Sequence, residues 1–294
     1  MSAHVPVLTI EAIRYLQPER GGVFVDCTVG LGGHSRALLE AGAARVIGLD
    51  RDLDALDMAR AALAPWSGRI ELVHSDFRAI DDALTRLDVA LVDGALADLG
   101  VSSLQLDGIG RGFSFQRDEP LDMRMDRSRG DTAADLLARS TEAEIADAIF
   151  AFGEERFSRR VARAIVEARR EAPIATTGRL AAIVRRAIPH RGHQRIDPAT
   201  RTFQGLRIWV NAELDGLDGF LRAAARRLRA GARLVVITFH SLEDRIVKHT
   251  FRALERAGDA VVRVLTKKPI VPGDDEIRRN PRARSAKLRA AERV

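Results

Sequence analysis

The sequence predicts an α/β fold, in which helices cover both faces of a mostly parallel sheet and a second, helical domain is inserted. Short, nearly continuous apolar runs recur at the spacing of alternating strands and helices, which is typical of parallel strands buried on both sides. The first run ends in Asp26 and leads through a glycine-rich turn toward an expected helix. The runs that end at Asp98 and begin at Arg233 lie more than 130 residues apart (98 to 233), so an inserted domain is expected between them.

The elements of the expected sheet follow in chain order. Its strands are predicted at 23–26, 45–50, 70–74, 89–98 and 233–240. A helix is predicted over 242–257, and the segments 261–271 and 285–294 are expected to close the sheet as a pair of strands, separated by a basic loop.

The segment between the fourth and fifth strands is helical by pattern. Thr141 followed by Glu144 forms a capping-box start. The stretch 154–170 places apolar residues on one face and arginines opposite, and Thr177 can begin another helix that runs to 188. An apolar stripe over 203–217 then leads back to the sheet.

The turn after the first strand is a candidate ligand site. Glycines 30, 32 and 33 follow Asp26, and the next strand ends in Asp50, where an acid can accept hydrogen bonds from ribose hydroxyls. A packing turn without a ligand is the alternative. A dinucleotide fingerprint needs glycine where Ser35 stands, whereas an acid followed by glycines four and six residues later resembles the first motif of S-adenosylmethionine methyltransferases. In that motif Asp26 would stand near the amino-acid end of the cofactor.

Composition is that of a soluble globular protein, with 294 residues of which 46% are hydrophobic and 30% charged. We find no apolar run of spanning length and no signal sequence, so neither membrane insertion nor export is expected. The single cysteine, Cys27, fits a reducing cytoplasm and is interpreted as a small apolar filler at the end of a buried strand.

The net charge of +6 resides in the segment 263–294, where ten Lys or Arg accompany four Asp or Glu. Arg282 and Arg284 belong to a basic stretch that could meet nucleic-acid phosphates. A solvated charge run is the alternative interpretation.

Motifs along the whole chain resemble the bacterial ribosomal small-subunit RNA (cytosine-N4)-methyltransferases, the RsmH or MraW family. They are GLGGHS at 30–35, DLGVSS at 98–103, RGFSF at 111–115, LDMRMD at 121–126, GEERF at 153–157, TRTFQ at 200–204, FHSLEDR at 239–245 and NPRARS at 280–285. The resemblance implies a class I S-adenosylmethionine methyltransferase fold, Rossmann-like, with a seven-stranded sheet and one antiparallel member. The expected methyltransferase domain comprises 1–104 and 213–294, and the all-helical insert for substrate recognition comprises 105–212.

The resemblance also implies a cofactor site. Matched by position, the family's S-adenosylmethionine contacts fall on Gly32, Gly33, His34, Asp50, Phe77, Asp98 and Gln105. In that site Phe77 can stack on adenine, and Asp76 beside it is a candidate acceptor for the adenine amine. Leu104 stands where the family commonly has proline, so the loop that places Gln105 loses a fixed φ.

The implied reaction is N4-methylation of a cytidine in the decoding region (P site) of 16S rRNA of the small ribosomal subunit. In-line methyl transfer mainly requires alignment, and acceptors aimed at the amine hydrogens would stabilise the charge that develops on nitrogen. The candidate catalytic residues are Asp98, Ser102 and Ser103, with His4, His240 and Ser241 expected near the same rim. His190 and His193 lack a cysteine or acid that would complete a metal pattern, so no metal is predicted.

Arginines on the insert and in the basic stretch are candidates for holding RNA. The insert supplies Arg156 and Arg160, with Arg159 and Arg163 on the same face, and the basic stretch supplies Arg282 and Arg284. The alternative functions are an RNA-binding ribosome assembly factor that keeps a cofactor pocket without turnover, and a dinucleotide oxidoreductase, which Ser35 disfavours. The oligomeric state is left open, with a homodimer as one option.

Overall fold

A computed structural model describes residues 6–189, 197–256, 258 and 261–294. Its contacts divide the chain into two compact units. The first, here the sheet unit, comprises Met1–Gly100 and Leu214–Val294, and the second, the helical unit, comprises Val101–Glu213. The boundaries predicted from the sequence lie after residues 104 and 212. No helix among the described residues is long and apolar enough to cross a membrane.

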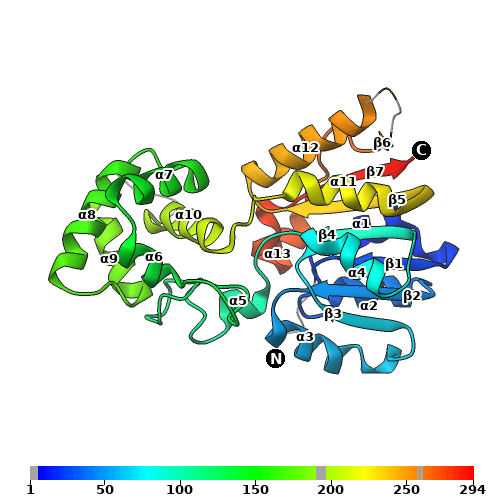
Figure 1. The fold of residues 1–294 in the computed structure, drawn as a ribbon, viewed down its shortest axis with the longest axis horizontal. Helices are drawn as coiled ribbons and strands as arrows, with labels where there is room; N and C mark the ends of the chain where they lie inside the picture. The colour runs from blue at the N-terminus through cyan, green and yellow to red at the C-terminus, as the bar shows by residue number, and fades with distance from the viewer. Residues whose placement is uncertain (1–5, 190–196, 257, 259–260) are drawn as a thin grey trace. The chain divides into compact units, whose positions relative to one another are not determined.

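The described part of the sheet unit contains a seven-stranded sheet in the order β3-β2-β1-β4-β5-β7-β6 (Figure 1). Its strands are β1 Val23–Asp26, β2 Arg45–Asp50, β3 Ile70–His74, β4 Val92–Asp98, β5 Leu228–Thr238, β6 Val262–Val264 and β7 Lys287–Arg293. The first five are parallel, and β7 runs antiparallel to both β5 and β6. Asp26, Asp50 and Asp98 therefore end neighbouring strands at one edge of the sheet.

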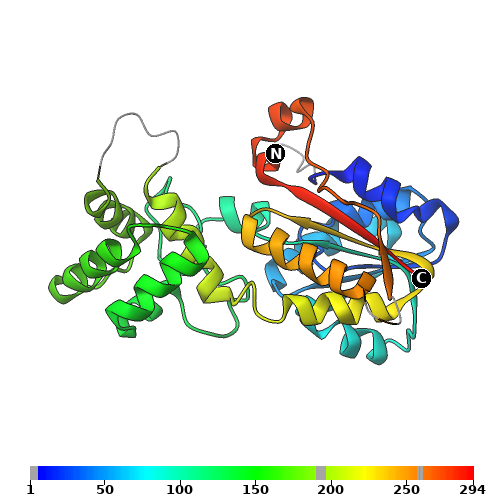
Figure 2. The same ribbon diagram turned by 90° about the horizontal axis from the view of Figure 1, so that it is seen from above.

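Helices cover both faces of this sheet (Figures 1 and 2). The helices of the sheet unit are α1 Thr9–Leu16, α2 Gly33–Glu40, α3 Leu53–Ala62, α4 Ile80–Arg86, α11 Leu217–Arg227, α12 Ser241–Arg256 and α13 Asp274–Arg279. The apolar residues of α1, α2 and α3 form one buried cluster, in which Leu8 and Leu38 are fully buried. Those of α4, α11 and α12 form another, which contains Phe220 and Phe251. The prediction of a parallel sheet buried on both faces is confirmed.

The turn between β1 and α2 depends on glycine. Gly30 and Gly32 have φ of 52° and 82°, in the left-handed region where side chains are disfavoured, and Gly32 is the N-cap of α2. In β2, a Cβ added to Gly48 would lie 2.4 Å from Cγ2 of Val29, so the turn packs directly on that strand. Cys27 is 1% exposed, which confirms its role as a buried filler.

The helical unit has its own apolar core. Its helices are α5 Ser103–Asp107, α6 Ala133–Arg139, α7 Glu142–Gly153, α8 Ser158–Glu171, α9 Thr177–Ala187 and α10 Ala199–Asn211. The predicted capping box of Thr141 and Glu144 is confirmed at the start of α7. The buried Asn211 donates to the carbonyls of Met123 and Arg207 and accepts from the backbone N–H of Met125, which ties the loop before α6 to α10.

Several predicted helices of the insert begin or end elsewhere. The helix predicted over 154–170 begins at Ser158, because Glu154 has φ of 51° and ends α7 in the left-handed region. The stripe over 203–217 is likewise interrupted at Ala212, with φ of 47°, and is divided between α10 and α11. The N-cap of α9 is Thr176 rather than Thr177.

The closing part of the sheet also differs from the prediction. The strand predicted over 261–271 is short, because only Val262–Val264 pairs with β7, although Ile270 makes an isolated bridge to Leu288. The expected basic loop contains α13 and the 3-10 helix η4, Pro281–Ser285. The helix α1 was not predicted.

Candidate functional site

The first acid of the edge, Asp26, holds the turn that follows it. Its side chain is fully buried; Oδ2 accepts a 2.7 Å hydrogen bond from Oγ of Ser35, and Oδ1 accepts from the backbone N–H of Thr28. Burial raises the pKa of Asp26, and the hydrogen bonds oppose that rise. Asp26 therefore acts on the protein's own backbone and on the start of α2.

The buried His34 and the partly buried Asp98 form a pair beside this turn. The backbone N–H of Asp98 donates to Oγ1 of Thr28 at 2.7 Å, which fixes the end of β4. Oδ2 of Asp98 lies 3.4 Å from Nε2 of His34, whose side chain is 5% exposed. Among the described residues, neither ring nitrogen of His34 nor Oδ1 of Asp98 has a hydrogen-bond partner. Buried polar atoms are almost always paired, so this pair has the character of a ligand site.

The charge of His34 depends on nearby acids. Burial lowers its pKa, but Asp98, Asp26 and Glu276 raise it, and the net shift is upward. The imidazole is therefore held closer to its cationic form than an isolated histidine. A cation and a carboxylate side by side match the two charged groups of an amino acid.

Asp50 ends β2 and contacts the glycine turn. Its Oδ2 accepts from the backbone N–H of Gly30 at 2.7 Å, and Oδ1 accepts from that of Asp52 at 2.9 Å. Burial raises the pKa of Asp50 to about 6. Because a carboxylate oxygen can accept a second hydrogen bond, Asp50 retains the capacity to bind a pair of hydroxyls.

Asp76 and Phe77 follow β3. Although burial raises the pKa of Asp76, hydrogen bonds from Arg78 and the nearby guanidinium of Arg51 hold it below its usual value. The side chain of Arg78 donates to both carboxylate oxygens of Asp76, the group expected to accept from the adenine amine. Phe77 is 9% exposed and packs edge-on against Phe220, with ring centroids 4.8 Å apart.

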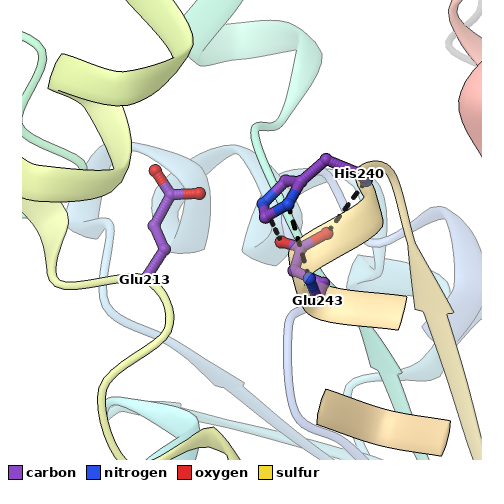
Figure 3. Close-up of side chains that lie close together, drawn as sticks. All are labelled: Glu213, His240 and Glu243. Carbon is purple, nitrogen blue, oxygen red and sulfur yellow. Dashed lines mark hydrogen bonds and ion pairs between the residues drawn. The ribbon is translucent and has the colours of Figure 1, made fainter. Parts of the chain in front are cut away.

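His240 follows β5 and is the N-terminal neighbour of α12 (Figure 3). Its Nδ1 accepts from the backbone N–H of Glu243 at 3.4 Å, and its Nε2 lies 3.1 Å from Oε1 of the same residue. Oε2 of Glu243 in turn accepts from the backbone N–H groups of Phe239 and His240. This reciprocal arrangement has the pattern of a capping box with histidine as the cap, and it directs the Nδ1 lone pair at the backbone.

Three candidate residues lie in the helical unit, at the start of α5. Oγ of Ser102 accepts from the backbone N–H of Gln105, and Oε1 of Gln105 accepts from that of Ser102, which forms a capping box. Ser103 is the first residue of α5 and Leu104 the second. The family's proline would stand in the first turn of α5, where proline is tolerated, and leucine at this position is equally compatible with the helix. The capping box holds Gln105 in place without the proline.

The candidate RNA-binding arginines are exposed on each unit. Arg160 lies on α8 and Arg156 just before it, with its guanidinium 4.7 Å from the ring centroid of Phe157. Arg282 and Arg284 lie in η4. Other basic residues of the 263–294 segment are structural: Arg289 and Lys287 both pair with Asp244, and Arg263 pairs with Glu292. His4, His190 and His193 lie outside the described residues.

Some residues that shape the site were absent from the sequence predictions. Thr28 supports Asp98, Ser35 supports Asp26, and Glu243 caps together with His240. The His240 to Glu243 spacing is that of a capping box, so this pairing had a detectable signal in the sequence. The contact of Thr28 with Asp98 had no detectable signal in the sequence. It joins residues 70 positions apart in the chain, which lie just past the end of β1 and at the end of β4.

The sheet order, with β7 antiparallel to both β5 and β6, is that of the class I S-adenosylmethionine-dependent methyltransferases. The acids at the carboxyl ends of β1, β2 and β4 lie where nucleotide-like ligands bind such sheets. The sheet order and the acids at the carboxyl ends of its strands thus define the class of enzyme, the S-adenosylmethionine-dependent methyltransferases.

The particular family follows from comparison with known proteins. The MraW methylase family matches residues 1–294, and the chain belongs to that family. It is 52% identical over 304 residues to the ribosomal RNA small subunit methyltransferase H of Nitrobacter winogradskyi, covering 99% of this chain and 91% of that protein. The enzymes of the same name from Sorangium cellulosum and Geotalea uraniireducens are 54% and 46% identical, over 99% of this chain and 91% and 98% of theirs. The protein is therefore a methyltransferase, and the oxidoreductase alternative is excluded.

Proposed function

We propose that this protein transfers a methyl group from S-adenosylmethionine to N4 of a cytidine in the decoding region (P site) of 16S rRNA, in the bacterial cytoplasm. Membership of a methylase family supports the reaction type, and the names of the relatives support small-subunit rRNA as the substrate class. The observation that carries the cofactor assignment is the pair of His34 and Asp98, in which three buried polar atoms, both ring nitrogens of His34 and Oδ1 of Asp98, have no hydrogen-bond partner among the described residues.

The residues of the sheet unit fit this cofactor. His34, held toward its cationic form, would bind the carboxylate of the methionine moiety, and Asp98 would bind its ammonium. Because Gly32 and Gly33 have no side chains, the methionine moiety of the cofactor could pass the start of α2 there. Asp50 would accept hydrogen bonds from both ribose hydroxyls. Phe77 is the candidate for the adenine. When bound, the cofactor supplies an electrophilic methyl group on its sulfonium.

The protein's part in the reaction is alignment and charge stabilisation. The lone pair of cytosine N4 is delocalised into the ring, so an acceptor at the amine hydrogens would localise it and stabilise the developing positive charge. Asp98 is the proposed acceptor in the sheet unit, and Ser102 and Ser103 are the proposed acceptors in the helical unit. Oγ of Ser102 already accepts from the backbone N–H of Gln105, so its second lone pair would be the one that accepts from the amine. We assign His240 the role of a cap rather than a base.

The insert proposed over residues 105–212, which lies within the helical unit, would recognise the substrate. Its exposed Arg156 and Arg160, with Arg282 and Arg284 of the sheet unit, would hold RNA phosphates. A cytidine must leave its stack to reach a cofactor at a sheet edge, so a flipped or single-stranded base is expected.

The direct test is transfer of radiolabelled methyl groups to naked 16S rRNA and to small subunits that lack the modification. Nuclease digestion and mass spectrometry of the product should show N4-methylcytidine at one P-site position. The Asp98→Asn variant should bind RNA normally and lose most of the transfer, with Asp215→Asn, an exposed acid after the insert, as the matched control. Absence of transfer to both substrates would overturn the proposal, and a methyl group at cytosine C5 would overturn the N4 assignment.

A further inference from the structure

We propose that Glu276, on α13, is a positioning residue for the cofactor site, because it holds residues 6–8 (the N-terminal segment) against the start of α2. The proposal rests on the assignment of Gly33 and His34 to the cofactor site. All of its contacts lie within the sheet unit.

The first contact joins two parts of the chain that are 268 residues apart. Oε1 of Glu276 accepts a 2.7 Å hydrogen bond from the backbone N–H of Leu8. Leu8 is the N-cap of α1, is fully buried and has no side-chain cap of its own. The carboxylate of Glu276 therefore supplies, from another element, a hydrogen-bond acceptor at the N-cap of α1, whose only acid in the first turn is Glu11.

The conformation of the N-terminal segment makes this contact important. Leu8 has φ of 52° and ψ of 34°, a left-handed conformation that is unusual for leucine and persists only where the surroundings impose it. Oγ1 of Thr9 donates to the carbonyl of Pro6 at 2.8 Å and closes the turn on its other side. The turn is thus held by one contact within the segment and one from α13.

The second contact reaches the glycine turn. A Cβ built on Gly33 would lie 3.0 Å from Cγ of Pro6 and 3.1 Å from its Cδ, so the proline ring lies directly on the α-carbon of Gly33. Gly33 is the first residue of α2 and precedes His34. The position of Pro6 therefore sets how far the backbone of this turn can move outward.

The charge of Glu276 acts in the same direction. Glu276 is one of the acids that raise the pKa of His34, so its carboxylate lies close enough to affect that imidazole. Through the N-terminal segment it positions the backbone at Gly33, and through its field it favours the cationic form of His34. Both effects favour binding of an anionic group at this turn.

The test separates positioning of the cofactor site from simple stabilisation of the fold. Four variants are compared with the wild type: Glu276→Ala, Glu276→Gln, Pro6→Ala and the double variant Pro6→Ala with Glu276→Ala. Asp275→Ala is the matched control, because Asp275 lies on the same helix, is exposed and pairs with Arg278. Calorimetry gives the Kd of S-adenosylmethionine, and thermal unfolding without ligand reports the folded state.

Glu276→Ala should raise Kd about five- to tenfold, the size of one typical lost hydrogen bond, with kcat at saturating cofactor within about twofold. Glu276→Gln keeps an oxygen acceptor for Leu8 and should recover part of the affinity. The double variant should bind no more than about twofold more weakly than Pro6→Ala, because both residues act through one segment.

If folded Glu276→Ala binds S-adenosylmethionine with a Kd within twofold of the wild-type value, the proposal is overturned. It is also overturned if the free-energy losses of Pro6→Ala and Glu276→Ala add fully in the double variant. Asp50→Ala serves as a reference for the cofactor site itself. If it weakens binding while Glu276→Ala does not, only the positioning role of Glu276 fails. If neither weakens binding, the assignment of the site fails with it.

Discussion

The affinity for S-adenosylmethionine should fall in acid because of Asp50. Burial raises the pKa of this carboxyl to about 6, and its two oxygens already accept from Gly30 and Asp52. Only the ionised carboxylate can also accept from both ribose hydroxyls, so cofactor binding should require loss of the proton. Because its pKa is raised, Asp50 stays partly protonated up to nearly neutral pH. The affinity for the cofactor should therefore reach its maximum above about pH 7 and decline as the pH falls through 6.

The size of the effect follows from the fraction ionised. With a pKa of about 6, about one Asp50 in eleven is ionised at pH 5, so Kd should rise about tenfold between pH 8 and pH 5, equivalent to about 1.4 kcal/mol. Calorimetry at pH 8, 7, 6 and 5 measures this directly. At pH 6, titrations in two buffers of different ionisation enthalpy should reveal release of about half a proton from Asp50 per cofactor bound.

Asp50→Asn is the matched variant, because the amide keeps one oxygen acceptor and cannot ionise. It should bind more weakly at pH 8, by about 1–3 kcal/mol, and its Kd should lose the pH dependence that belongs to Asp50. His34 and Asp26 are present in both proteins, so the difference between the two profiles isolates Asp50. Parallel profiles for wild type and Asp50→Asn, with folding intact, would refute the reasoning.

Other substitutions test the remaining parts of the molecule. Arg282→Ala with Arg284→Ala should weaken RNA binding and reduce the slope of log K against log salt by about 1–2, measured by filter binding at several salt concentrations; an unchanged slope excludes phosphate contacts by these residues. Ser35→Ala should leave a buried oxygen of Asp26 without its donor and cost about 1–3 kcal/mol in urea unfolding, and a loss below about 0.5 kcal/mol would show that Asp26 finds another donor. Asn211→Leu should destabilise the chain by about 2–4 kcal/mol in the same assay, because it removes several buried hydrogen bonds; a stable variant would contradict that accounting.

Most of the sheet was predictable because its signal is local. Near-continuous apolar runs mark β1 to β5, and the acids that end them are visible in the same runs. The helix ends were less predictable. Glu154 and Ala212 adopt left-handed conformations that end α7 and α10, and neither residue type signals such a turn in a sequence.

In the candidate site, too, some residues were predictable from the local sequence and others were not. Asp50 and the glycine turn were named from spacing alone, whereas the cofactor assignments of His34 and Phe77 came from the family resemblance. The supports of the site were hidden, because Thr28 and Glu276 act on residues distant in the chain. A contact between strand ends or between the two ends of a fold has no periodicity from which it could be inferred.

The position of β7 has a consequence for how the protein is made. This strand follows every other strand in the sequence, yet it lies between β5 and β6 in the sheet. While the chain is being synthesised, β5 exposes an unpaired edge and β6 has no partner until β7 emerges. A chain without β7 is therefore vulnerable to pairing with another strand, and the sheet of this ribosomal RNA methyltransferase can be completed only after β7 has been synthesised.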